Sequence, residues 1–282
     1  MTAWLATVST RRSATGGFPK SAAFGIVVII GFAVAAILAP LLAPYDPKAV
    51  DLSSSMSGPS AAHLLGTDGA GRDILSRLMH GARLSLLGPL LVVLFAAAIG
   101  VPLGIAAGYL GGWLDGTLSR FFDLIFAFPA LLLAAVIVAT FGPGFVTIVI
   151  AVTVIYIPLM ARVVRAGAIV EREKPYVDAL RVQGFGTVRI TGRHIAPNLS
   201  PLVIGQAALY FGYALLDLAG LSFLGFGVQP PTPDWGSMLW YANQSVYVSP
   251  TGVLWPALAI VLSVVALNLV GDWLVDRAAT NR

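Results

Sequence analysis

The feature that most constrains this chain is the length of its uncharged runs. Between Leu124 and Ala161 there is no charged residue. A helix of about 20 apolar residues crosses a bilayer core about 30 Å thick, so this run is too long for a single span. The Gly-Pro-Gly sequence at 142–144 interrupts it, and such residues favour turns. The run therefore predicts a helical hairpin in a membrane, with spans at 121–141 and 145–164.

Four further apolar runs are long enough to cross a membrane, and they lie at 22–43, 84–110, 199–224 and 251–271. The composition agrees, because only 11% of the residues are charged against about 25% in a typical soluble domain. There is no Cys, which excludes disulfides, thiolate metal sites and a cysteine nucleophile. The sequence predicts an all-α polytopic membrane protein with six transmembrane helices.

The basic residues indicate how these spans are oriented. With the N-terminus in the cytoplasm, all but four of the 17 Lys and Arg residues fall on the cytoplasmic side, as the positive-inside rule requires. The pair Arg11-Arg12 precedes the first run as in a signal peptide, but the run exceeds a usual h-region, so we expect a retained helix. The predicted organisation is a cytoplasmic tail at 1–21, a first span at 22–43, an extracytoplasmic loop at 44–83, a five-helix core at 84–276 and a cytoplasmic tail at 277–282.

The cytoplasmic loop at 165–201 is long, basic and amphipathic. Pro175 suits the first position of a short helix, and Gly184 and Gly186 permit a sharp turn after it. Thr187 is expected to cap a second short helix, which Pro197 is expected to stop. One interpretation of such a loop is an interfacial linker held by lipid head groups. The other is a docking surface for a cytoplasmic partner.

The second interpretation is favoured by a resemblance. Residues 176–180, followed by Gly184 and Pro197, resemble the EAA loop of ABC-importer permeases, with Asp178 in place of the usual Glu and Leu180 in place of the second Ala. Further groups are similar to the dipeptide and oligopeptide branch of that family, and the resemblance extends from about His63 to the C-terminus. These groups are His63–Asp68, Gly71–Arg77, Gly81–Arg83, Gly220–Gly225, Val228–Gly236 and Asn268–Asp272.

The resemblance implies a type I ABC-importer permease fold and import of di- or oligopeptides across a bacterial inner membrane. It implies a homologous second permease, two cytoplasmic ATPases that bind ATP and Mg²⁺, and an extracytoplasmic solute-binding protein; no nucleic acid is expected. The chain itself should be no enzyme and hold no cofactor, since residues 16–21 lack the Gly-Lys pair of a P-loop. The implied ATPase-coupling residues are Tyr176, Val177, Asp178, Ala179, Leu180, Arg181, Gly184 and Pro197.

One acidic residue, Asp217, lies deep in a predicted span. A carboxylate there is costly and normally faces the bundle or an aqueous path. It is expected either to hydrogen bond to a neighbouring Tyr, Asn or Ser or to pair with the ammonium group of a peptide. The polar residues of the spans, and hence the candidate translocation path, are Tyr156, Gln206, Tyr210, Tyr213, Asp217 and Asn268.

The last outer loop is rich in proline and aromatic residues. It is expected to anchor the protein at head-group level or to contact the solute-binding protein through Gln229, Pro230, Pro231, Asp234 and Trp235.

Two other interpretations remain open from the sequence. The same architecture could import nickel or another chelate, and a different class, an ion-coupled secondary transporter, would show inverted repeats and several intramembrane charges. No metal site is predicted, because His63, His80 and His194 lack helical ligand spacing. Arg120 and Asp123, three residues apart, are expected to form an ion pair.

Overall fold

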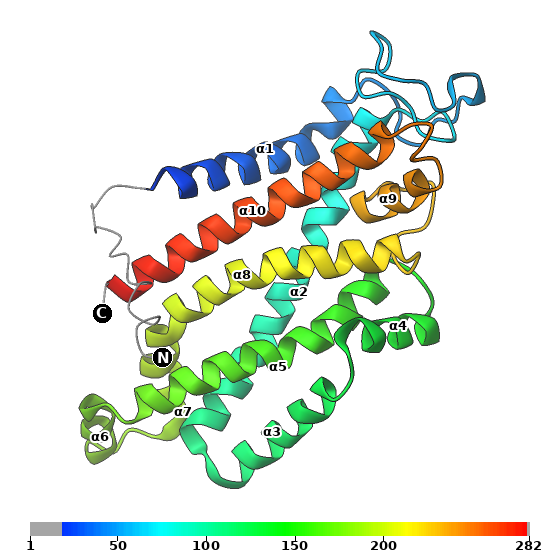
Figure 1. Cartoon of the computed structure of the whole chain (residues 1–282). Coiled ribbons are helices and arrows are strands. Elements are labelled where there is room, and N and C mark those ends of the chain that lie inside the picture. Colours follow the sequence, from blue (N-terminus) through cyan, green and yellow to red (C-terminus); the bar gives the residue numbers. More distant parts are fainter. Residues whose placement is uncertain (1–18, 281–282) are drawn as a thin grey trace, which may run out of the picture.

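The computed structural model of the chain describes residues 19–280, with side chains to 277. Within these residues the structure contains helices and no strand. Four long helices lie side by side and α2 crosses behind them (Figure 1). All five are long and apolar enough to cross a membrane. Their bounds are Lys20–Leu42 (α1), Ile74–Leu110 (α2), Phe145–Arg172 (α5), Ala196–Phe223 (α8) and Thr251–Thr280 (α10).

The predicted third span is not one helix. Its sequence forms α3 (Gly112–Phe126) and α4 (Ala130–Phe141), which are bent by 82° at the break between them. Pro129 explains the break, because its ring disfavours a helical conformation at the preceding Phe128 and it has no N–H to donate. At 12 residues, α4 is about 18 Å long. The continuous helix predicted at 121–141 is therefore wrong, and a sixth span exists only if the bent pair is counted as one.

The segment between α5 and α8 also differs from the prediction. It forms α6 (Pro175–Val182), α7 (Thr187–Ile190) and a π-helical turn (Thr191–Ile195) that continues into α8. Pro197 stops no helix, because it lies in the first turn of α8, and the wider π turn before it accommodates the missing N–H. Gly186, and not Thr187, is the N-cap residue of α7.

A row of glycines joins α2 to α5. A Cβ atom on Gly100, Gly104 or Gly108 would lie only 2.8, 2.5 or 2.6 Å from a backbone carbonyl oxygen of α5. Small residues at every fourth position let membrane helices approach this closely. The two helices consequently form one tightly packed pair through the centre of the core.

The outer end of the molecule is assembled around the start of α2. Asp73 caps this helix by accepting a hydrogen bond from the Ser76 N–H at 2.8 Å, so α2 begins ten residues before the predicted span at 84–110. The buried Arg77 donates Nη1 hydrogen bonds to the carbonyl oxygens of Pro47, at 2.8 Å, and Pro231, at 3.3 Å. Arg77 thereby joins two outer loops to α2. Helix α9 (Trp235–Asn243) lies at this end, opposite α6 and α7 (Figure 1).

Candidate functional site

Helix α6 presents an apolar side to the bundle and a mixed side outward. It begins at Pro175, as predicted. Val177 is fully buried, and Tyr176 and Leu180 pack against the same hydrophobic cluster. The remaining predicted coupling residues of this helix are exposed; they are Asp178, Ala179 and Arg181. The outward side of α6 is therefore available to a partner.

The predicted sharp turn at Gly184 is present. Gly184 has a φ of +80°, in the left-handed region that favours glycine. The Phe185 N–H donates to the Leu180 carbonyl at 3.0 Å, and the Gly184 N–H donates to the Arg181 carbonyl at 2.9 Å. These two bonds form a Schellman motif, which ends α6 and redirects the chain toward α7.

Two exposed valines flank this turn, and the sequence reasoning missed them. Val182 is 89% exposed and Val188 is 85% exposed. Next to Val188, the Arg189 guanidinium lies over the Phe185 ring, 4.3 Å from its centroid. The sequence signal that could have identified them is the presence of valines among basic residues in a polar loop. An apolar side chain exposed to water there contributes nothing to stability, which suggests that a partner covers it.

A buried carboxylate, also missed, connects α6 to two long helices. Glu171, at the end of α5, is 2% exposed. Its Oε1 accepts hydrogen bonds from the Tyr176 hydroxyl at 2.9 Å and from the Asn198 Nδ2 of α8 at 2.8 Å. Its Oε2 lies 2.6 Å from the Lys174 ammonium. Burial, and next the hydrogen bond to Glu171, raises the pKa of Tyr176 to about 12, so this hydroxyl remains a donor at neutral pH.

Two arginines attach the same region to the end of α2. Arg172 donates from Nη1 to the Gly108 carbonyl at 3.0 Å. Arg181 donates from Nε to the Tyr109 hydroxyl at 3.3 Å and from Nη1 to the Asp178 carboxylate at 3.0 Å. Cationic side chains at a helix C-terminus satisfy carbonyl groups that lack partners in the helix. The predicted coupling residues therefore form one assembly with the ends of α2, α5 and α8.

Four of the six candidate path residues share one side of α8. Gln206, Tyr210, Tyr213 and Asp217 recur at the i, i+4, i+7, i+11 spacing of a helix face. From α5, the Tyr156 hydroxyl donates to Asp217 Oδ2 at 2.8 Å, and its ring meets the Tyr210 ring edge-on, with centroids 5.5 Å apart. The hydrogen bond to a neighbouring Tyr, one of the two roles predicted for Asp217, is thus present. Tyr213 is 50% exposed.

The sixth residue, Asn268, lies elsewhere. It belongs to α10, and its Oδ1 faces Gly212, where a Cβ atom would lie 3.3 Å away. Gly212 is on a different side of α8 from the tyrosines. Within residues 19–280, Asn268 Oδ1 is buried without a hydrogen-bond partner. The structure therefore separates Asn268 from the other path residues.

The predicted outer rim divides into an exposed and a buried part. Gln229, Pro230 and Pro231 are exposed. Asp234 is 5% exposed and Trp235 is fully buried, so neither can contact a receptor at the surface, and we correct their assignment. Asp234 caps α9 by accepting from the N–H of Gly236 and Ser237, and its burial raises its pKa.

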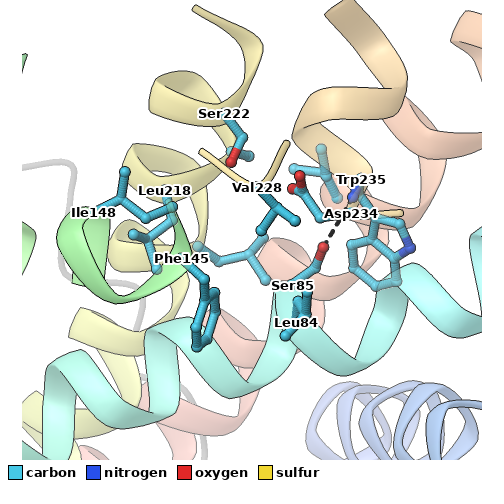
Figure 2. A pocket seen from close by; sticks show the side chains of 12 residues that line it. Leu84, Ser85, Phe145, Ile148, Leu218, Ser222, Val228, Asp234 and Trp235 are labelled. Carbon is cyan, nitrogen blue, oxygen red and sulfur yellow. Dashed lines mark hydrogen bonds between the residues drawn. The ribbon is translucent and has the colours of Figure 1, made fainter. Parts of the chain in front are cut away.

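Trp235 instead joins α9 to α2. Its indole Nε1 donates to the Leu78 carbonyl at 2.9 Å, and its backbone N–H donates to Ser85 Oγ at 3.0 Å. Figure 2 shows the hydrogen bond between Trp235 and Ser85 beside a cavity lined by Asp234 and Ser222. At about 20 Å³ the cavity has room for about one water molecule and cannot admit a peptide.

Two smaller expectations concern charges. Asp123 pairs with Arg162 of α5 and not with Arg120, since α3 lies in contact with α5. His63 Nδ1 lies 3.0 Å from Asp73 Oδ1. Over residues 19–280, no group of three His, Asp or Glu side chains is arranged to hold a metal ion.

Comparison with known proteins places this arrangement in a class. Residues 100–280 match the family described as binding-protein-dependent transport system inner membrane component, and residues 20–59 match the N-terminal TM domain of oligopeptide transport permease C. The chain belongs to this family of transport permeases, which makes it a multi-pass protein of the inner membrane.

Individual relatives narrow the class. The dipeptide transport system permease protein DppC of Escherichia coli K12 is 47% identical, over 91% of this chain and 88% of that protein. The di/tripeptide permease DppC of Pseudomonas aeruginosa UCBPP-PA14 is 43% identical, over 91% and 87%. The glutathione permease GsiD of Escherichia coli O6:K15:H31 is 40% identical, over 91% and 84%.

A solved structure confirms the predicted fold. The MetNI methionine ABC transporter, in inward-facing conformations, matches with a TM-score of 0.56 at 18% identity, over 72% of this chain and 96% of that chain. The type I ABC-importer permease fold predicted from the sequence is therefore confirmed, whereas the bend between α3 and α4 is the detail that hydropathy did not reveal.

Proposed function

We propose that this chain is the permease subunit of an ATP-driven importer of short peptides. The observation that carries the proposal is its 43–47% identity, over 91% of its length, to permeases named for dipeptide and di/tripeptide transport. No residue arrangement in the described part of the chain favours a chelate or an ion-coupled mechanism. Peptide import is accordingly the function that we assign.

In this proposal separate ATPase subunits bind ATP and Mg²⁺, and this chain binds neither. They dock on the exposed side of α6 and the turn at Gly184, flanked by Val182 and Val188. Closure of the ATPase pair moves this surface and shifts the permease between inward- and outward-facing states. The shift arises because the closed ATPase pair binds these two states of the permease with different affinities. A second permease completes the path, and the solute-binding protein docks at the opposite end, near Gln229 and Pro230.

The polar side of α8, on which Tyr213 is exposed, supports a path shared with a second subunit. A hollow of about 640 Å³ lies among α1, α2, α8 and α10 and is lined almost entirely by apolar side chains such as Phe32 and Leu86. A peptide carries two termini and a polar backbone, so this hollow offers it too few partners. The tyrosines and Asp217 on α8 offer hydrogen-bonding groups instead.

The proposal is tested by uptake in proteoliposomes that contain the complete transporter. ATP and binding protein should drive uptake of a labelled dipeptide, and a nickel chelate should not accumulate. Accumulation of the chelate without the peptide would overturn the proposed cargo. Uptake driven by an ion gradient in the absence of ATP would overturn the proposed class.

The orientation, with tails 1–21 and 277–282 in the cytoplasm, is part of the proposal. The native chain has no Cys, so single cysteines report accessibility without background from this subunit. Cysteines at Ser60 and Tyr247, both exposed, should react with an impermeant thiol reagent in intact cells, and a cysteine at Thr187 should not. If only the cysteine of Thr187→Cys were labelled, the proposed orientation would be wrong and both tails would lie outside.

A further inference from the structure

Helix α6 is bonded to α2 through Arg181 and the Tyr109 hydroxyl, but it has few attachments to α5 and α8. Val177 is its one fully buried residue among those described, and apolar contacts of this kind are non-directional. Such a contact holds a short helix against the bundle without fixing its angle. A helix that must transmit force to α5 and α8 needs a directional attachment to them as well, because rotation about an apolar contact would dissipate the movement.

The carboxylate of Glu171 provides that attachment. Its hydrogen bonds reach Tyr176 in α6 and Asn198 in α8, and Asn198 Nδ2 also lies 3.1 Å from the Tyr176 hydroxyl. The three side chains thus form a closed ring that joins three helices. Hydrogen bonds to an ionised group are shorter and stronger than neutral ones, and a buried carboxylate without partners would be costly.

The helices joined by Glu171 are those that carry the candidate path. Tyr156 of α5 lies 15 residues from Glu171, or about 22 Å along the helix. Asp217 of α8 lies 19 residues from Asn198, or about 28 Å. The Tyr156–Asp217 hydrogen bond links the same two helices a second time. Helices α5 and α8 are therefore cross-connected both at the coupling end and beside the path.

We propose that Glu171 is a positioning residue that fixes the angle of α6 relative to α5 and α8, so that α5, α6 and α8 move as one body when the ATPases close. Glu171 touches neither peptide nor nucleotide in this role, and it acts through Tyr176 and Asn198. The test by peptide transport rests on the proposed function, whereas the test by spin-label distances does not.

The structural test uses spin labels on the complete transporter, with other subunits free of reactive cysteine. Labels at Val170 and Gln183 report α5 against α6, and labels at Ile204 and Gln183 report α8 against α6; all three sites are exposed. Both distance distributions should be narrow and unchanged by ATP. Glu171→Ala should broaden both. Glu173→Ala is the matched control, because that neighbouring carboxylate is 69% exposed and pairs only with Arg172 among the ion pairs described.

The functional test measures peptides imported per ATP hydrolysed. Losing hydrogen bonds to a buried charge should lower this ratio roughly tenfold in Glu171→Ala, with ATP hydrolysis retained, and Glu173→Ala should keep the wild-type ratio. If Glu171→Ala fails to assemble, Tyr176→Phe, which removes one hydroxyl, should still broaden the α5–α6 distances and lower the ratio.

The positioning role would be overturned if Glu171→Ala kept narrow distance distributions and the wild-type ratio of peptides imported per ATP. If Glu171→Ala does not assemble, the same result in Tyr176→Phe would overturn it. If the wild-type complex imports no peptide, the proposed function fails, while the label distances still decide the role of Glu171.

Discussion

Replacing Gly104 with alanine should force α2 and α5 apart. The new Cβ atom would lie 2.5 Å from the Ala161 carbonyl oxygen and 2.8 Å from Val164 Cβ, and no rotamer can relieve a clash of Cβ with backbone. The helices must separate by roughly 1 Å to restore ordinary contact distances. That movement also loosens the neighbouring contacts at Gly100 and Gly108.

The magnitude follows from two opposing effects. Overpacking costs about 1–3 kcal/mol, and alanine regains at most about 1 kcal/mol through its helix propensity. Because the 2.5 Å contact is with a backbone atom, we place the overpacking cost at about 2–3 kcal/mol. We therefore expect Gly104→Ala to lose about 1–2 kcal/mol of stability, which lowers the melting temperature by roughly 2–8 °C. The assay is thermal unfolding of the purified transporter in detergent, followed by loss of the monodisperse peak.

Gly31→Ala is the matched control. Gly31 also lies in a spanning helix, α1, but no atom lies within 4 Å of a Cβ built there. That variant should be neutral or slightly stabilised. Equal melting temperatures for Gly104→Ala and the wild-type protein would refute the close packing of α2 against α5.

Three further changes test other parts of the structure. Gly184→Val forces a β-branched residue into the left-handed region, at a cost of about 1–2 kcal/mol, and should abolish ATP-driven uptake in assembled transporter, whereas Gly186→Ala, at a φ of −71°, should not. Val182→Asp should weaken copurification of the ATPases without changing the thermal stability of the permease; unchanged copurification would remove Val182 from the docking surface. Asp217→Asn keeps an acceptor for the Tyr156 hydroxyl but loses the charge that strengthens this hydrogen bond, so it should slow uptake of free and N-acetylated peptides equally; selective loss of uptake of the free peptide would instead identify Asp217 as the partner of its ammonium group.

The sequence predicted those features that depend on local chemistry. Apolar runs located the spans, Pro175 located the start of α6, and Gly184 located a turn with positive φ. Hydropathy averages over a run and does not detect its direction, so it missed the 82° bend between α3 and α4, although Pro129 was a visible signal.

Features that depend on distant contacts were not accessible in this way. Trp235 looked like an interfacial aromatic residue, but its indole donates to Leu78, 157 residues away. Glu171 was not singled out from the sequence, because its partner Asn198 lies 27 residues further on. In both cases the burial of the side chain arises from tertiary packing, which no local pattern records.

Helix α2 has a consequence for communication across the membrane. Its 37 residues make a rod about 55 Å long, held at one end by Arg77 and the outer loops and at the other by Arg172 on the Gly108 carbonyl. A tilt of about 10° around its middle would move each end about 5 Å, in opposite directions. A partner bound at the outer surface and nucleotide bound at the inner one would then favour or oppose the same tilt. Thermodynamic linkage requires that each changes the binding affinity of the other by the same factor.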